Sequence, residues 1–99
     1  MSEQPPTPVR LHVIVEGRVQ GVGYRAFVEQ AADAFGLNGW VRNRWDGSVE
    51  VTAEGPRPVL ERFLHSLGVG PRMANVTTLL PEWLEASGEF AGFAVRRSA

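Results

Sequence analysis

Three glycines and two arginines lie within nine residues, in the stretch GRVQGVGYR from Gly17 to Arg25. Gly17, Gly21 and Gly23 can adopt backbone conformations closed to other residues, which lets successive N–H groups converge on one point. A helical pattern follows at once, so these groups would lie at a helix N-terminus, where the helix dipole attracts an anion. The guanidinium of Arg25, in the first helical turn, can bind two oxygens of a phosphate. A plain glycine-containing turn with a solvated arginine has the same spacing, so both interpretations stay open at this point.

Asn43 is a second candidate, at the end of a predicted strand in GWVRNRWDG. An amide can donate to one partner and accept from another, so Asn43 could hold a water beside a phosphate bound at the loop. An isolated asparagine ahead of Asp46-Gly47 is more often a turn residue. Three further arginines add positive charge here or are simply solvated: Arg18, Arg42 and Arg44.

The composition excludes several kinds of chemistry. The 99 residues contain neither cysteine nor lysine, which excludes disulfides, thiolate metal sites, Schiff bases and a Walker lysine. His12 and His65 are far apart and form no metal-binding pattern, so we expect neither a metal nor a cofactor. The glycine spacing also differs from the G-x-G-x-x-G of dinucleotide-binding folds. The net charge of −1 argues against a general nucleic-acid binder.

Apolar periodicity predicts the elements that would position these residues. Alternating apolar residues indicate strands, helical spacing indicates helices, and Asp46-Gly47 indicates a tight turn. Gly36 and Gly68 are expected just past the two helix ends. The predicted elements are a strand over Val9–Glu16, a helix from Tyr24 to Phe35, a hairpin over Asn38–Gly55, a helix over Arg57–Leu67, a strand over Ala74–Trp83 and a short strand within Phe90–Arg97.

This βαββαβ order with a short terminal strand predicts an α+β fold. It is a ferredoxin-like split βαβ sandwich, with two helices on one face of a mostly antiparallel sheet. In the third strand, Val49, Val51 and Ala53 alternate with polar residues, as expected where only one sheet face is covered. Trp40 and Trp45 are interpreted as packing residues.

The N-terminal residues 1–8 are polar and proline-rich, and we expect them to form a disordered tail before a single domain over 9–97. The N-terminus lacks a signal-peptide pattern and no apolar run is long enough to span a membrane. The sequence therefore predicts a cytoplasmic protein with no membrane partner, and its small size favours a monomer.

The quoted motifs resemble the two signatures of the acylphosphatase family. GRVQGVGYR matches the first signature and GWVRNRWDGSVE, from Gly39 to Glu50, matches the second. The resemblance continues through EGP, FLHSLGVGPRMANV and FAVRR, and so covers roughly Val9 to Arg97. Gly23 and Tyr24 occupy positions where the family varies or often has phenylalanine.

The resemblance implies hydrolysis of the carboxyl–phosphate anhydride of an acyl phosphate, giving a carboxylate and inorganic phosphate without a metal. It implies that Arg25 binds the phosphate and that Asn43 positions the attacking water. The phosphate oxygens would be held by the backbone amides of six loop residues: Val19, Gln20, Gly21, Val22, Gly23 and Tyr24. The residue types agree with this chemistry, because a carboxylate with a conjugate-acid pKa near ~4–5 can leave without a general acid. Loose phosphoryl transfer also depends mainly on positioning and charge stabilisation.

Two other classes of function are alternatives to an enzyme. Similar domains are fused at the start of larger carbamoyl-transfer maturation proteins, so a non-catalytic phosphate-binding module is one alternative. The intact Arg25 and Asn43 favour the enzyme. An RNA-binding sheet would need exposed aromatic residues on its central strands. The polar-face positions supply none: Arg10, His12, Ser48, Glu50, Thr52 and Glu54.

Overall fold

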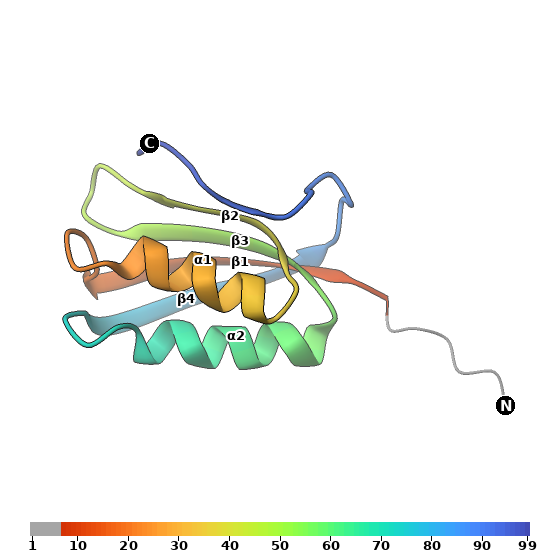
Figure 1. The fold of residues 1–99 in the computed structure, drawn as a ribbon, viewed down its shortest axis with the longest axis horizontal. Helices are drawn as coiled ribbons and strands as arrows, with labels where there is room; N and C mark the ends of the chain where they lie inside the picture. The colour runs from red at the N-terminus through yellow and green to blue at the C-terminus, as the bar shows by residue number, and fades with distance from the viewer. Residues whose placement is uncertain (1–6) are drawn as a thin grey trace, which may run out of the picture.

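The computed structural model describes residues 7–99, which form a five-stranded sheet with two helices (Figure 1). The predicted order of elements is confirmed. Residues 1–6 of the predicted tail lie outside the described residues, and Thr7 and Pro8 have no regular secondary structure. The elements are β1 (Val9–Arg18), α1 (Tyr24–Ala34), β2 (Asn38–Asn43), β3 (Val49–Gly55), α2 (Arg57–Val69), β4 (Asn75–Glu85) and β5 (Phe93–Val95).

The strands lie in the order β4-β1-β3-β2-β5. β1 pairs antiparallel with both β3 and β4, and β2 pairs antiparallel with β3. α1 connects β1 to β2 and α2 connects β3 to β4, so β3 separates the parallel strands β1 and β2, as in a split βαβ sandwich. The terminal strand β5 lies parallel to β2 at one edge of the sheet, with Phe93 paired to Gly39. The sequence pattern did not predict at which edge this strand lies. The predicted α+β fold is confirmed.

The hydrophobic core lies between the helices and the inner face of the sheet. The ring of Phe63 from α2 meets Phe35 edge-on, with ring centroids 6.5 Å apart. Burying one large apolar side chain contributes about 1.5–3 kcal/mol, so this layer holds α1 firmly against the sheet. The core residues from the strands are Leu11, Val13, Val15, Val41, Val49, Val51 and Ala53, and those from the helices include Val28, Ala32, Leu60, Phe63 and Leu67.

The outer face of the sheet is more covered than the sequence pattern predicts. The chain must pass from β4 at one sheet edge to β5 at the other, and residues 86–92 make this connection. Glu54 on β3 accepts hydrogen bonds from the backbone amides of Ser87 (2.7 Å) and Gly88 (3.0 Å) and from Arg10 Nε (2.7 Å). Thr52 and Glu54 are only 4% and 5% exposed. The prediction that one face alone is covered is therefore wrong at this end of the sheet.

The second helix is longer than predicted. It ends at Val69, and Gly70, with φ 67°, follows it and donates its amide to the carbonyl of Ser66 (2.9 Å). The predicted end at Gly68 is wrong, because Gly68 lies in the last helical turn against Leu79 of β4. A Cβ added there would lie 3.2 Å from Leu79 Cδ1, so close packing accounts for this glycine.

The two tryptophans have different environments. Trp40 on β2 is largely buried, and the guanidinium groups of Arg42 and Arg96 lie 4.7 and 4.9 Å from its ring centroid. Trp45 is 83% exposed, so its prediction as a packing residue is wrong. It lies in the turn between β2 and β3, outside the regular elements.

Candidate active site

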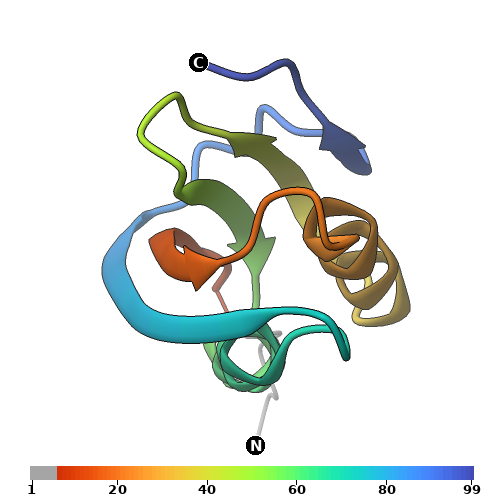
Figure 2. The same cartoon turned by 90° about the vertical axis from the view of Figure 1, so that its left-hand side faces the viewer.

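The predicted site residues meet at one end of the sheet. β1 ends at Arg18, β2 ends at Asn43, and β3 begins at Val49, which pairs with Val15 on one side and Asn43 on the other. The start of β3 therefore lies between the loop that follows β1 and the strand end that carries Asn43. Figure 2 looks onto this end and shows the loop leading from β1 into α1.

Three glycines give the loop its path. The pairing of β1 with β4 shifts register between Glu16 and Gly17, and a Cβ at Gly17 would collide with the carbonyl oxygen of Asn75. Gly21 and Gly23 have φ of 72° and 78°, in the left-handed region that favours glycine. The local chain direction therefore requires glycine, as the spacing predicts.

The loop delivers the chain to an uncapped helix N-terminus. α1 starts at Tyr24 after Gly23, which has no side chain to cap the helix, and the first turn contains no acidic residue. The leading N–H groups of a helix have no partners within the helix. Buried Tyr24 fixes this helix end, because its hydroxyl donates to the carbonyl of Leu67 in α2 (2.7 Å). Burial also raises the pKa of Tyr24 above its ordinary value, so the hydroxyl stays a donor.

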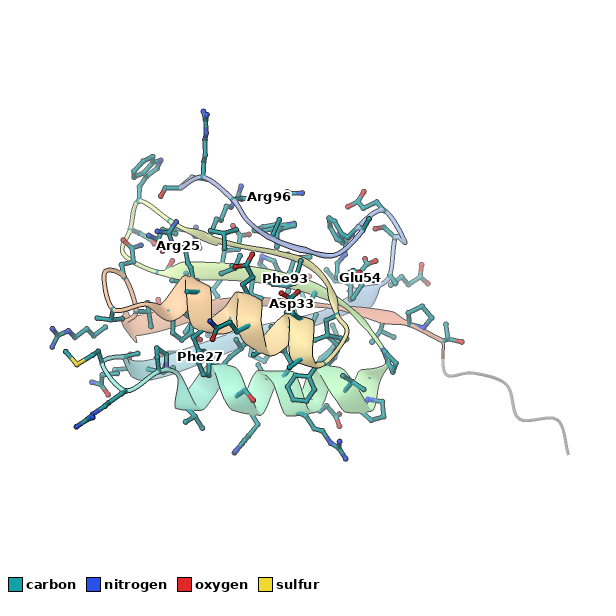
Figure 3. All side chains as sticks on the ribbon, in the orientation of Figure 1. Arg25, Phe27, Asp33, Glu54, Phe93 and Arg96 are labelled. Carbon is teal, nitrogen blue, oxygen red and sulfur yellow. The ribbon has the colours of Figure 1, made fainter. Side chains whose placement is uncertain are left out.

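Arg25 lies in the first turn of α1, at the end of the molecule that carries the β2–β3 turn (Figure 3). Its side chain is half-buried. A cation at a helix N-terminus opposes the helix dipole, at a cost of about 0.3–1 kcal/mol. An anion held between the guanidinium and the helix amides would reverse the sign of that interaction.

Asn43 carries a buried oxygen without a partner. Val41, two residues earlier, is fully buried in the core, so alternation along β2 directs Asn43 toward the helix-covered face. Within residues 7–99, Asn43 Oδ1 is the one buried side-chain N or O atom that lacks a hydrogen-bond partner. An acceptor left in this state costs about 1–3 kcal/mol. It therefore marks a place where a water or a ligand can donate a hydrogen bond.

The side chain of Gln20 is part of the site in a way that the sequence did not indicate. Its Nε2 donates to the carbonyl oxygens of Arg44 (2.7 Å) and Ser48 (2.8 Å), the two ends of the β2–β3 turn. The resemblance assigned only the backbone of Gln20 to the site. A contact across 24 residues has no periodic signal in a single sequence, so nothing in the pattern could have indicated it.

The other arginines contribute less to the loop than their sequence positions suggest. Arg42 lies on the outer face, where its Nε pairs with Glu50 Oε1 at 2.7 Å. The Arg44 guanidinium lies 3.9 Å from Asp46 Oδ2. Arg18 is exposed. The guanidinium in the first turn of α1 is thus the cation that the fold places at the start of the helix.

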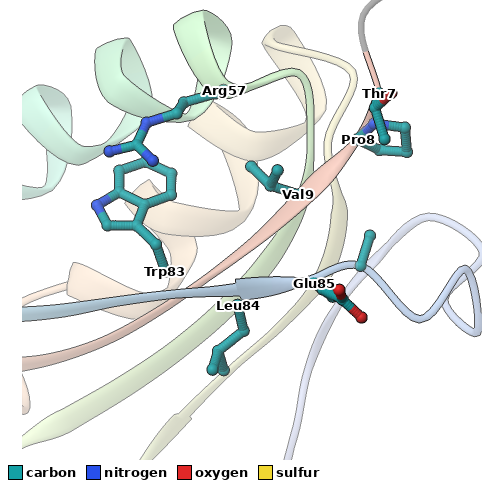
Figure 4. A pocket seen from close by; sticks show the side chains of 8 residues that line it. Thr7, Pro8, Val9, Arg57, Trp83, Leu84 and Glu85 are labelled. Carbon is teal, nitrogen blue, oxygen red and sulfur yellow. The ribbon is translucent and has the colours of Figure 1, made fainter.

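A hollow of about 510 Å³ lies at the opposite end of the sheet (Figure 4). Val9, at the start of β1, lines it together with Arg57 and Trp83, whose ring centroid lies 4.1 Å from the Arg57 guanidinium carbon. The glycine loop follows the other end of β1, so this hollow plays no part in the predicted site.

Over residues 7–99, no three His, Asp or Glu side chains gather in a way that could hold a metal ion. None of the helices in the same range is long and apolar enough to cross a membrane.

The fold and this end of the sheet define a class of small α+β proteins with a glycine-rich loop before the first helix. A family model described as acylphosphatase matches residues 11–95. The chain is 53% identical over 79 residues to an acylphosphatase of Thermus thermophilus, covering 80% of this chain and 90% of that one. It is 45% identical over 91 residues to an acylphosphatase of Salinibacter ruber, covering 92% and 96%. The crystal structure of acylphosphatase from Bacillus subtilis superimposes with a TM-score of 0.86 at 39% identity, covering 89% of this chain and 98% of that one.

The chain belongs to the acylphosphatase family, as the two motifs predict. It is a hydrolase of that family, and hydrolysis of acyl phosphates is the activity that membership carries.

Proposed function

We propose that the substrate's phosphate binds in the loop between β1 and α1. The backbone amides of residues 19–24 donate to its oxygens, and Arg25 binds two of them through its planar guanidinium. Three features support this assignment: the left-handed glycines, the helix start without a side-chain cap, and a cation placed against the helix dipole. The glycines let the loop amides converge, while the uncapped helix start and the opposed cation become favourable once an anion is bound.

Asn43 positions the attacking water. The observation that carries this proposal is the buried Oδ1 of Asn43, which has no partner in residues 7–99 and lies at the same end of the sheet as the loop. A water that donates to Oδ1 satisfies the amide and keeps a lone pair available for phosphorus. Holding the two reactants at a fixed approach replaces a bimolecular encounter, which can supply about 7–11 kcal/mol of a barrier.

The reaction then needs no acid or base from the loop. The water oxygen forms a bond to phosphorus while the bond from phosphorus to the acyl oxygen breaks, and the bonding pair leaves with the carboxylate. Both protons of the water stay with the phosphate product, which then equilibrates with solvent. A carboxylate is a stable leaving group at neutral pH, and the guanidinium and the amides offset the charge on the phosphoryl oxygens.

The direct test is hydrolysis of benzoyl phosphate by the purified chain in the presence of EDTA. We expect release of benzoate and inorganic phosphate well above the uncatalysed rate, with no loss of rate on chelation. Tight binding of phosphate without turnover would contradict the proposal and favour a non-catalytic phosphate-binding module. Cytoplasmic location and the monomeric state stay predictions from the sequence, and light scattering after gel filtration tests the second.

A further inference from the structure

The β2–β3 turn is held as a compact unit beside the phosphate loop. The amide of Arg44 donates to Ser48 O (2.9 Å), and the amide of Gly47 donates to Arg44 O (3.1 Å). Asp46 Oδ1 accepts from both the amide and the hydroxyl of Ser48, at 2.9 and 2.6 Å. These hydrogen bonds join the turn to the residues at its two ends.

Gln20 connects this unit to the loop. Its Nε2 donates one hydrogen bond to Arg44 O and one to Ser48 O, so both amide protons of the side chain are used. Arg44 directly follows Asn43, and Ser48 directly precedes Val49, the cross-strand partner of Asn43. The two carbonyls that Gln20 binds thus flank the end of β2 where Asn43 lies.

The side chain of Gln20 is not available to bind phosphate itself. With both N–H groups donated, only its Oε1 could face a ligand, and an acceptor oxygen repels a phosphate oxygen. The backbone of Gln20 belongs to the loop, between buried Val19 and left-handed Gly21. One residue therefore joins the segment that would hold the phosphate to the segment that would hold the water.

We propose that Gln20 is a positioning residue, whose side-chain amide fixes the separation between the phosphate loop and Asn43. This inference rests on the proposed function. The Oδ1 of Asn43 has no protein partner to anchor it, so the position of its side chain depends on the backbone at the end of β2. The two hydrogen bonds from Gln20 fix that backbone relative to the loop, while the pairing with Val49 and the amide of Ala99 (3.0 Å to Asn43 O) fix it within the sheet. A misplacement of about 1 Å between reacting groups can cost about 10²-fold in rate, so this link controls kcat.

The test is a double-mutant cycle between Gln20→Met and Asn43→Ala, with benzoyl phosphate as substrate. Methionine has nearly the length of glutamine but cannot donate hydrogen bonds. We expect Gln20→Met to lower kcat about 10–100-fold, while KM and the inhibition constant of inorganic phosphate change less than about threefold. In the Asn43→Ala background the same substitution should change kcat less than about twofold, because the residue that it positions is gone. Gln30→Met, on the exposed face of α1, is the matched control and should match the wild type.

The possible outcomes separate this inference from the proposed function. An equal loss of kcat in both backgrounds, or a loss of phosphate binding as large as the loss of kcat, would overturn the positioning role alone. An unchanged kcat in Asn43→Ala would overturn the proposed function and this inference together.

A second measurement needs no variant: hydrogen exchange of the ¹⁵N-labelled side-chain amide of Gln20. We expect exchange much slower than that of Gln30, and equal exchange rates would show that the two hydrogen bonds do not persist.

Discussion

Two side chains with buried oxygens, Glu54 and Asn43, lie at opposite ends of the sheet and differ in what they contact. The Glu54 carboxylate accepts from Arg10, from the amide and hydroxyl of Ser87, and from the amide of Gly88, all within 3.1 Å. Asn43 Oδ1 accepts nothing from residues 7–99. Glu54 lies on the outer face under the β4–β5 connection, whereas Asn43 faces the helix layer at the end of β2.

Glu54 therefore has the contacts of a structural residue, whereas Asn43 keeps an acceptor that the proposed function assigns to a water. Buried acceptors are nearly always satisfied in folded proteins, because an open one costs about 1–3 kcal/mol. The fold meets this requirement fully at Glu54 and leaves it unmet at Asn43. The same end of the molecule also carries Arg25 against the helix dipole. Two features that disfavour the free protein therefore lie where the phosphate would bind, as expected of a functional site.

Replacement of Arg25 should have the largest effect. We expect Arg25→Ala to lower kcat/KM for benzoyl phosphate about 10³-fold, with KM raised and kcat lowered together, because the guanidinium contacts phosphate both before and during transfer. The free energy of unfolding should stay equal or rise slightly, since the substitution removes a cation from a helix N-terminus. Steady-state kinetics and urea unfolding measure the two quantities. Arg62→Ala, exposed on α2, is the control, and a comparable loss of kcat/KM there would contradict the assignment.

Asn43→Ala should have the next largest effect, confined to turnover. We expect kcat to fall about 10²-fold with KM changed only a few-fold, because a water-positioning amide acts in the reaction and not in phosphate binding. Since Oδ1 has no partner to lose, the free energy of unfolding should not fall. Asn75→Ala, an exposed asparagine at the start of β4, is the matched control. A large loss of stability in Asn43→Ala would mean that the amide is structural, like Glu54.

The sequence predicted the loop and the start of the helix that follows it. Gly17, Gly21 and Gly23 indicated the loop because they can adopt conformations closed to other residues, and the helical pattern correctly began at Tyr24. Asn43 was a candidate from its place at the end of a strand, but such a residue is more often part of a turn, and only the resemblance assigned it the role of positioning water. The side-chain bonds of Gln20 could not be predicted, since they depend on how the loop and the turn meet in three dimensions.

A single sequence carries no signal for contacts between irregular segments, and this also explains the wrong prediction that only one face of the sheet is covered. Alternation correctly placed Thr52 and Glu54 opposite the core, but it carried no information on which segment would cover them. Residues 86–92 have no periodic pattern, and the place where they cross follows from β4 and β5 lying at opposite sheet edges. Local periodicity thus predicted the elements and their inner face, whereas contacts between irregular segments needed the structure.

Glu54→Gln should reduce stability while leaving the reaction intact. The substitution turns one acceptor oxygen into a donor that faces other donors, so we expect the free energy of unfolding to fall by about 1–3 kcal/mol. Glu61→Gln is the matched control, because Glu61 forms an exposed pair with Arg57 on α2 at 3.3 Å. Such a pair contributes about 0.3–0.5 kcal/mol. Urea unfolding measures the stability of both variants. A kcat of Glu54→Gln far below the wild-type value would show that Glu54 also affects the reaction, which would contradict a purely structural role.

Acid should weaken the Glu54 end selectively. Burial by itself would raise the pKa of Glu54, but the amide of Ser87, the Arg10 guanidinium and the amide of Gly88 outweigh it and lower that pKa from its ordinary 4.5. A carboxyl whose pKa is lower in the folded state stabilises the protein fully above its unfolded pKa and loses this contribution as pH falls through the folded value. The stability difference between wild type and Glu54→Gln should therefore be constant near neutral pH and shrink below about pH 4.5. The pKa of Glu50 is lowered as well, but its contribution is the same in both proteins and cancels in the difference. A stability difference that stays constant down to about pH 3 would show that Glu54 is not paired in the folded protein.

The smallest expected effect is that of pH on kcat, which depends on the end of the sheet with the proposed site. The side chains assigned to the reaction are a guanidinium and an amide, and neither type titrates between about pH 5.5 and 7.5. We therefore expect kcat for benzoyl phosphate to stay nearly flat over this range, measured at saturating substrate and constant ionic strength. A bell-shaped profile there would show that a titrating base takes part in the reaction. Glu16, an exposed carboxylate directly before the loop, would then be the first group to replace, and a flat profile in Glu16→Gln would identify it as that base. A flat profile in the wild type instead leaves positioning by Arg25, the loop amides and Asn43 as the source of catalysis.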